Sequence, residues 1–463
     1  MKKVFLFALI AIVMCACSDN MMLNEPENPV LCRSNDQTPT VSYSVTPDMV
    51  CKYLNIARKG KTIDSITPVI EDGDTLAYVA QYTGNNGWDL ISGDKRVAPV
   101  LASANSGILN LNDTINPAVK ALNGMVQIVL DAKESADTIK DKMWEFLEPK
   151  TIVINNRPQQ RGNGIGKWII DDTIYESDNY TAPHIITTKW GQGEPWFYKT
   201  PYINGTHSKV GCVSVAAGQI IYHFRKNNNR DILLPTKITY NDTINGYPTF
   251  TDFSTFGWSS IKTVANYAWN PDNGTAKFLS YLGNQLGTRY GLNESGADPN
   301  DVPGVLASYR LSSTKSNMYN FDIILENLKS SKPVYVSCES TNGIGHSFII
   351  DAYEYRVERM YVKFIWDPNA ELEDGEDPMP ESAITDKDGK YERIEDITCQ
   401  EYYSIMMNWG YDGSYDNYKY TAYSYTKWGE DSPIIRYYDP YWTINLSTYT
   451  NFGFMIYNIT EAI

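Results

Sequence analysis

A single cysteine stands at the head of an apolar segment with helical spacing, GCVSVAAGQIIYHF, which runs from Gly211 to Phe224. A cysteine becomes a nucleophile when its thiol is deprotonated. The N-terminal end of a helix and a neighbouring imidazolium both lower the pKa of a thiol. Cys212 therefore occupies a position that favours nucleophilic catalysis. A small buried core thiol is nevertheless the commoner role of a cysteine, so the pattern needs a base nearby.

The chain has four histidines, which narrows the search for that base. His346 follows a glycine-flanked turn in GIGHSFIIDAY and begins an apolar, strand-like run. A strand end beside a helix N-terminus suits a thiolate–imidazolium pair, although a core role fits His346 equally well. His184 and His207 lie in polar segments and are expected at the surface, whereas His223 lies inside the helix.

Two further segments contain groups that such a pair would need. The segment MMNWGYDG contains Asn408 and Trp409. An amide oxygen can accept the far ring N–H of a histidine, and an indole beside it shields that bond from water. The segment KWGQGEPW contains Gln192, whose amide could donate to an oxyanion together with the Cys212 backbone N–H. Trp409 as a core residue and Gln192 as an ordinary loop residue stay open on this pattern alone.

Together these segments resemble the streptopain family of papain-like cysteine peptidases, in order and spacing, over most of residues 185–415. The matching residues are Trp190-Gly191-Gln192 with Pro195; Gly211-Cys212-Val213 with Gln219 and Tyr222-His223; Pro333-Val334-Tyr335 with Gly345-His346 and Asp351; and Asn408-Trp409-Gly410 with Gly413. The separation of cysteine and histidine also falls in the roughly 130–150 residues of papain-like enzymes. Four matching segments make the resemblance specific.

The resemblance implies a role for each candidate residue. Cys212 would be the nucleophile and His346 the base. Gln192 would donate to the oxyanion. Asn408 and Trp409 would surround the histidine, with Asn408 orienting its ring. The implied fold is a papain-like catalytic domain, made of a helical part and an antiparallel sheet.

Some positions depart from the family pattern. Tyr411 stands where the family has its second aromatic residue of the last motif, and Asp412 replaces the glycine that follows. The stretch between His346 and Asn408 is long and includes a very acidic insertion, residues 371–396. Its DKDG segment lacks a ligand position of a calcium loop, so a solvated hairpin extension is the favoured interpretation.

Length and composition predict two folded units in a globular chain. The chain has 463 residues, of which 42% are hydrophobic and 13% aromatic. A chain of this length exceeds what one compact core usually holds. The net charge of −15 disfavours binding to nucleic acid, because a phosphate backbone repels an acidic surface.

The first residues, MKKVFLFALIAIVMCACSDN, have the pattern of a bacterial lipoprotein signal peptide. Two lysines precede an apolar run that is too short to span a bilayer. We expect a signal peptide over residues 1–17, with Cys17 as the lipidated residue, and a flexible tether over 18–42. Acyl chains on Cys17 would anchor the protein at a membrane. Ordinary secretion with cleavage nearby is the alternative.

In the second unit, helical patterns come first and strand patterns follow, which indicates an α+β fold. The segment GWDLISGDKRVAPVLASANSG is similar to the propeptide of the same family, and we expect residues 43–154, which contain it, to form a smaller α+β propeptide domain. We expect a helix after Thr46-Pro47 and another after Asn116-Pro117. Residues 155–183 are expected to be a linker with the activation cleavage, and 184–463 the peptidase domain.

The resemblance and the signal pattern together imply a secreted cysteine endopeptidase of the cell envelope, an outer-membrane lipoprotein made as a zymogen. Its partners would be protein or peptide substrates and its own propeptide, which acts as an intramolecular inhibitor. This reaction requires no metal or organic cofactor, and the cysteines lack the CxxC spacing of a zinc site. A Cys338–Cys399 disulfide stays open beside free thiols. The alternatives are a catalytically inactive surface lipoprotein that binds glycan or protein on this scaffold, and a proteinaceous inhibitor formed by the first unit.

Overall fold

The structure is a computed structural model. It describes residues 42–112, 116–134, 144, 167–225, 237–240, 249–252, 258–265, 274–339, 345–367, 384–385, 391–427, 434–437 and 451–461. The predicted signal peptide with Cys17, nearly all of the tether, and most of the acidic insertion lie outside the described residues. Among the described residues, no helix is both long and apolar enough to cross a bilayer.

The chain forms two compact units. Of the described residues, unit 1 comprises 42–101, 105–109, 129–134 and 144, and unit 2 comprises 102–104, 110–112, 116–128 and those from 167 onward. The predicted boundary at residue 154 differs from this division, because residues 110–128 pack with the second unit. One contact that holds them there is a 3.2 Å hydrogen bond from the Tyr420 hydroxyl to the Ala118 carbonyl oxygen.

Unit 1 begins with helix α1 (Pro47–Ala57), as the sequence predicts. The Thr46 hydroxyl caps the helix by accepting a 3.3 Å hydrogen bond from the Met49 backbone N–H, and Pro47 occupies the first turn. The strands β1 (Ile63–Glu71), β2 (Asp74–Tyr82) and β3 (Trp88–Ser92) form an antiparallel meander after it.

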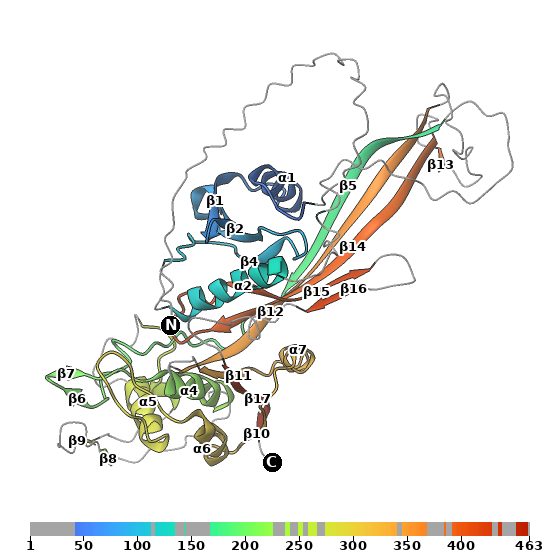
Figure 1. Cartoon of the computed structure of the whole chain (residues 1–463). Coiled ribbons are helices and arrows are strands. Elements are labelled where there is room, and N and C mark those ends of the chain that lie inside the picture. Colours follow the sequence, from blue (N-terminus) through green and yellow to red (C-terminus); the bar gives the residue numbers. More distant parts are fainter. Residues whose placement is uncertain are drawn as a thin grey trace. The chain divides into compact units, whose positions relative to one another are not determined.

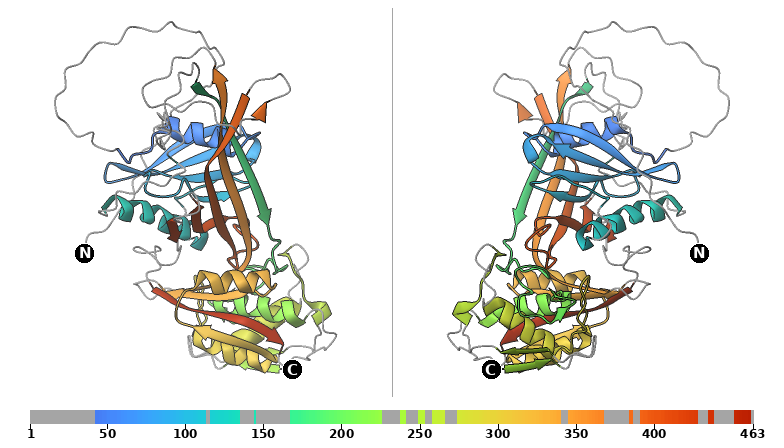
Figure 2. Two further views of the ribbon diagram at one scale, coloured as in Figure 1. Left: turned by 90° about the vertical axis from the view of Figure 1, so that its right-hand side faces the viewer. Right: turned by 90° about the vertical axis from the view of Figure 1, so that its left-hand side faces the viewer.

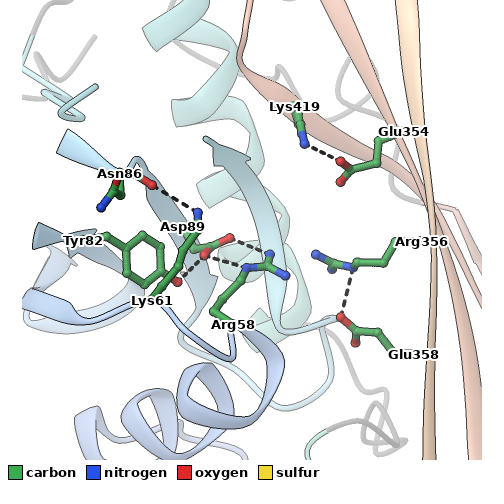
Figure 3. Close-up of polar contacts among 9 residues, drawn as sticks. All are labelled: Arg58, Lys61, Tyr82, Asn86, Asp89, Glu354, Arg356, Glu358 and Lys419. Carbon is green, nitrogen blue, oxygen red and sulfur yellow. Dashed lines mark hydrogen bonds and ion pairs between the residues drawn. The ribbon is translucent and has the colours of Figure 1, made fainter. Parts of the chain in front are cut away.

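A buried ion pair ties the end of α1 to β3. The Arg58 guanidinium donates two hydrogen bonds to the Asp89 carboxylate, of 2.7 and 3.0 Å, and the Tyr82 hydroxyl donates to the same carboxylate (Figure 3). Asp89 is 1% exposed. A carboxylate so deeply buried requires these donors, because an unpaired buried charge is costly.

Unit 2 is built on an antiparallel sheet. Its strands are β5 (Lys167–Thr181), β10 (Leu311–Ser316), β11 (Val334–Glu339), β12 (Gly345–Asp367), β13 (Ile384–Thr385), β14 (Tyr391–Asn408), β15 (Lys419–Lys427), β16 (Ile434–Tyr437) and β17 (Asn451–Glu461). The order is β15-β14-β12-β11-β17-β10, and β5 pairs with β12. The predicted strands HSFIIDAY and RMYVKFIW join in one strand, β12.

Strand β5 differs from the expectation of a linker over residues 155–183. Residues 167–181 pair in register with β12, from Lys167 opposite Asp367 to Thr181 opposite Glu354. Strands β5, β12 and β14 run side by side as a long ribbon (Figure 2). The segment KWIIDDTIYESDNYT is rich in β-branched and aromatic residues, which favours a strand. Residues 155–166 lie outside the described residues.

The helices of unit 2 precede most of its strands, and with the antiparallel sheet they confirm the predicted α+β class. They are α4 (Cys212–Arg225), α5 (Gly274–Gln285), α6 (Val302–Ser308) and α7 (Phe321–Lys329), and α2 (Pro117–Glu134) contributes residues up to 128. Helix α4 is buried as predicted, and it packs against α5, α6 and one face of β11 and β12. Helix α7 lies on the other side of β11 (Figure 1).

Candidate active site

Cys212 is the first residue of α4, as the sequence predicts. The preceding Gly211 has a φ of +93°, and a Cβ atom at this position would lie 3.0 Å from the Ser295 carbonyl oxygen. Glycine is therefore required by both its backbone angle and the close approach of the neighbouring loop. This turn sets the thiol at the N-terminal end of the helix.

The Cys212 thiol lies beside the backbone of Ser347, the residue that follows the candidate base His346. Burial raises the pKa of the thiol, and the backbone groups of Ser347 and Val213 only partly oppose that effect. The helix N-terminus, which was expected to favour the thiolate, is thus outweighed by desolvation. The thiol is protonated at neutral pH in this arrangement.

His346 lies in β12, opposite Cys338 of β11, and is 5% exposed. Its Nε2 atom lies 3.1 Å from the Trp409 carbonyl oxygen. Burial lowers the pKa of His346 to about 4, and the positive charge of Lys120 lowers it further, while the Trp409 carbonyl opposes both. The ring is therefore neutral at pH 7.

The thiol and the imidazole approach β12 from different faces. Ile349 belongs to the same hydrophobic core as α4, and Ser347 faces that side too, because its hydroxyl accepts from Tyr335 at 2.7 Å. Side chains alternate along a strand, so His346 faces the other side. Its ring stacks there with Phe348 and Trp409, at centroid distances of 5.9 and 6.1 Å.

The N-terminal part of α2 covers the face on which His346 lies. Lys120 is close enough for its charge to act on His346 and Cys338, and burial lowers the pKa of Lys120 itself. The Tyr420 ring, whose hydroxyl bonds Ala118, packs edge-on against Trp409 at 6.0 Å. Residues 110–128 thus contribute to the surroundings of the candidate base.

Asn408 is bonded to neighbours other than His346. Its Nδ2 atom donates to the Thr188 carbonyl oxygen at 2.9 Å, and its Oδ1 atom accepts from Gln219 Nε2 at 2.9 Å and from the Gly410 N–H at 3.2 Å. Among the described residues, none of these bonds reaches the His346 ring, which meets the Trp409 carbonyl instead. An orienting role for the Asn408 amide stays a prediction.

Gln192 lies beside the turn that precedes Cys212, because its carbonyl oxygen accepts a 3.0 Å hydrogen bond from the Val210 N–H. Asp412, which replaces the expected glycine, ties the two loops together. Its N–H donates to the Trp190 carbonyl oxygen at 3.3 Å, and its carboxylate accepts from the Trp196 indole. The departure from the family pattern thus adds a contact between these loops.

Sequence reasoning missed a second group of polar residues behind the site. His184, expected at the surface, lies with its Nδ1 atom 2.9 Å from Oδ1 of the buried Asp351. Asp416 accepts a 3.4 Å hydrogen bond from the Trp409 N–H. Burial and the Asp351 charge raise the pKa of Asp416 to about 7. Asp351 was visible as a polar residue in an apolar strand run, whereas His184 and Asp416 carried no comparable signal.

The described residues bear on the open disulfide and on metal binding. Cys338 forms no disulfide, so the Cys338–Cys399 bridge that the sequence left open is not present. Among the described residues, no three histidine, cysteine or acidic side chains gather as they would around a metal ion.

Comparisons with known proteins gave a match to a family model and similarity to solved structures. A fragment of prointerpain A from Prevotella intermedia, carrying a point mutation, is 17% identical, with a TM-score of 0.48, covering 86% of this chain and 98% of that one. Active wild-type interpain A cysteine protease from the same organism is 18% identical, with a TM-score of 0.35, covering 60% and 94%. No curated protein sequence gave a significant match. Residues 190–371, which include Gln192, Cys212 and His346, match the peptidase C10 family, and the predicted resemblance to streptopain is thereby confirmed.

Proposed function

We propose that the protein is a cysteine endopeptidase held in a latent state. The observation that carries the proposal is the position of Cys212, at the start of α4 and beside the backbone of Ser347, the residue next to His346. The match of this region to the C10 peptidase family supports it. In this proposal, His346 reaches the thiol once it leaves the face covered by α2.

The chemistry follows the general scheme for a thiol nucleophile. His346 takes the proton of Cys212, and the thiolate attacks the scissile carbonyl carbon. The Gln192 amide and the Cys212 backbone N–H donate to the oxyanion. His346 then protonates the leaving amine and later removes a proton from the water that hydrolyses the thioester. Asn408, or the Trp409 carbonyl, orients the imidazole.

Latency in this proposal rests on the protonation states of the pair. The raised pKa of Cys212 and the lowered pKa of His346 leave both groups uncharged at pH 7. An ion pair forms only when the two groups lie within about 4–6 Å, because each charge then stabilises the other. We assign residues 110–128, with the preceding unit, the role of the inhibitory propeptide. Their removal would free His346 to turn.

Processing of the full chain tests the proposal. The wild type should convert to a shorter form and degrade casein, whereas Cys212→Ala should do neither because it lacks the nucleophile. Cys51→Ala is the matched control, since Cys51 is another partly buried cysteine outside any disulfide. N-terminal sequencing should place the cut before Lys167, because β5 is paired along its length with β12. Prompt processing of purified Cys212→Ala would contradict self-cleavage.

Reactivity of the thiol separates this function from that of an inactive surface lipoprotein on the same scaffold. An enzyme should lose peptidase activity in step with alkylation of Cys212, at a rate well above that of Cys338. An inactive binding protein should show no such link.

We also propose, from the sequence pattern alone, secretion to the cell envelope with a lipid anchor on Cys17. Fatty-acid labelling of the wild type but not of Cys17→Ser would support the anchor, and equal labelling would refute it.

A further inference from the structure

Gln219 is a polar residue at the centre of a buried apolar helix. Its side chain is 0% exposed, and its neighbours Gly218 and Ile220 are buried as well. Burying a primary amide is costly unless its hydrogen-bonding groups are satisfied, so the contacts of Gln219 need an explanation.

The Gln219 amide joins two loops of the candidate site to the helix that carries the thiol. Its Nε2 atom donates to Asn408 Oδ1 at 2.9 Å. Its Oε1 atom accepts from the Thr188 hydroxyl at 2.8 Å and, more weakly, from the Trp190 backbone N–H at 3.4 Å. Gln219 follows Cys212 by about two helical turns, so the same rigid element holds the thiol and this amide.

Each of these contacts leads to a group of the proposed reaction. Trp190 lies two residues before Gln192, the proposed oxyanion donor. Asn408 holds the Gly410 N–H at 3.2 Å, and this bond fixes the peptide of Trp409, whose carbonyl oxygen meets the His346 ring at 3.1 Å.

The Gln219 donor also determines which way the Asn408 amide points. In the observed orientation, Oδ1 meets two donors, from Gln219 and Gly410, and Nδ2 meets the Thr188 carbonyl oxygen. A flipped amide would set Nδ2 against two N–H donors and Oδ1 against a carbonyl oxygen. All three hydrogen bonds would be lost in a buried site, which makes the flip unfavourable.

We propose that Gln219 is the positioning residue of this peptidase, which aligns the Cys212 helix with the Gln192 loop and the Trp409 turn. The inference rests on the proposed function. It predicts that loss of the Gln219 donor slows the chemical steps by misaligning these groups while substrate still binds. A misplacement of about 1 Å in an active site can cost on the order of 100-fold in rate.

Two substitutions distinguish a positioning role of Gln219 from a role in core packing alone. Gln219→Leu removes both hydrogen-bonding functions. Gln219→Glu keeps the acceptor toward Thr188 but sets a carboxyl group against Asn408 Oδ1. A protonated carboxyl can donate to that oxygen, whereas an ionised one repels it. We expect kcat on casein-derived peptides to fall about 10-fold or more in both, with KM within about 2-fold of the wild type. Only Gln219→Glu should recover as the pH falls.

Further variants keep the test decisive if these do not fold. Thr188→Val removes one donor to Gln219, and Thr188→Ser retains it, so Val should lower kcat and Ser should restore it. Ser214→Ala is the control, because Ser214 is a buried polar residue of the same helix whose hydroxyl faces Thr288 at 3.4 Å. It should leave kcat unchanged.

The outcomes distinguish the inference from the function on which it rests. An active wild type whose Gln219 or Thr188→Val variants fold and turn over normally would overturn the inference alone. A pH-independent loss in Gln219→Glu that only follows thermal stability would also overturn it. A wild type without peptidase activity after processing would overturn both.

Discussion

The turn that carries Trp409 is held by two polar networks of different character. On one side the Gly410 N–H donates to the Asn408 amide, which is fixed by Gln219, and none of these groups titrates. On the other side the Trp409 N–H donates to the Asp416 carboxyl, which lies in the field of Asp351. The Gly410 N–H thus depends on a network of amides that does not change with pH, whereas the adjacent Trp409 N–H depends on a carboxyl group that does.

One side of the turn can therefore keep its geometry at any pH while the other side responds to pH. An amide network keeps its geometry at any pH, whereas a carboxyl that is forced to share its surroundings with another carboxyl changes charge near neutrality. We therefore expect substitutions in the acidic group, His184, Asp351 and Asp416, to act mainly through stability and its pH dependence. Substitutions at Gln219 should act mainly on rate.

The largest effect is expected from Asp351→Ala. Asp351 is 0% exposed and accepts hydrogen bonds from His184 and from the Ile186 N–H, at 2.9 and 3.2 Å. Its loss leaves the buried Ile186 N–H without its acceptor and removes the partner of His184, so it should lower the free energy of unfolding by about 3 kcal/mol, measured by urea unfolding. Asp351→Asn is the matched control, since it keeps an acceptor and should cost less. Equal losses in both would show that charge, not the acceptor, is what matters.

An intermediate effect is expected from Asp416→Asn, and it should depend on pH. Burial and the Asp351 charge raise the pKa of Asp416 from 3.8 to about 7. A group that holds its proton more tightly in the folded state makes the free energy of unfolding fall as pH rises through that interval. His184 and Asp351, which face it, also have raised pKa values and act in the same direction, and Lys189 opposes them.

Asp416→Asn should therefore make the fall in the urea midpoint between pH 4 and about 7 shallower than in the wild type. The acceptor for the Trp409 N–H is retained by the asparagine side chain, so the midpoints at the acid end should nearly coincide. A slope as steep as that of the wild type would show that Asp416 does not titrate in this range.

The sequence predicted one network in part and the other hardly at all. The apolar spacing around Cys212 located the buried helix, and a buried helix with one glutamine requires partners for that amide. Which partners these are depends on Asn408, far away in the chain, so no local pattern could name them. The acidic group was even harder to predict from the sequence, because His184 contacts Asp351 only once β12 has been placed in the fold.

The position of His346 also lay beyond sequence reasoning. Its motif placed it correctly at the start of a strand, but strand alternation gives two faces and the choice depends on what packs on each. Helix α2 lies on one face and α4 on the other, and both are long-range contacts. Strand β5 was missed for the same reason: its segment follows a polar stretch, and its pairing with β12 is not local.

The smallest effect on stability is expected from His184→Gln. The sign of its effect at acid pH should be opposite to that of the matching change at His207. Burial lowers the pKa of His184, but the hydrogen bond and charge of Asp351 outweigh it, so the pKa is raised. The stabilisation is then fully present below the unfolded pKa, 6.5, and is lost as pH rises through the folded value. The His184 side chain is 34% exposed, so solvent screening keeps the effect below about 1 kcal/mol.

His207→Gln is the matched control for this prediction. His207 is also half-buried, but burial lowers its pKa, while the Thr200 carbonyl opposes the shift. Protonation of His207 therefore destabilises the folded state at acid pH, and its removal should raise the urea midpoint at pH values below 6.5. His184→Gln should lower the midpoint at the same acid pH and leave it unchanged in alkaline buffer. Shifts of the same sign in both variants would mean that the Asp351 carboxylate does not act on His184 as its position requires.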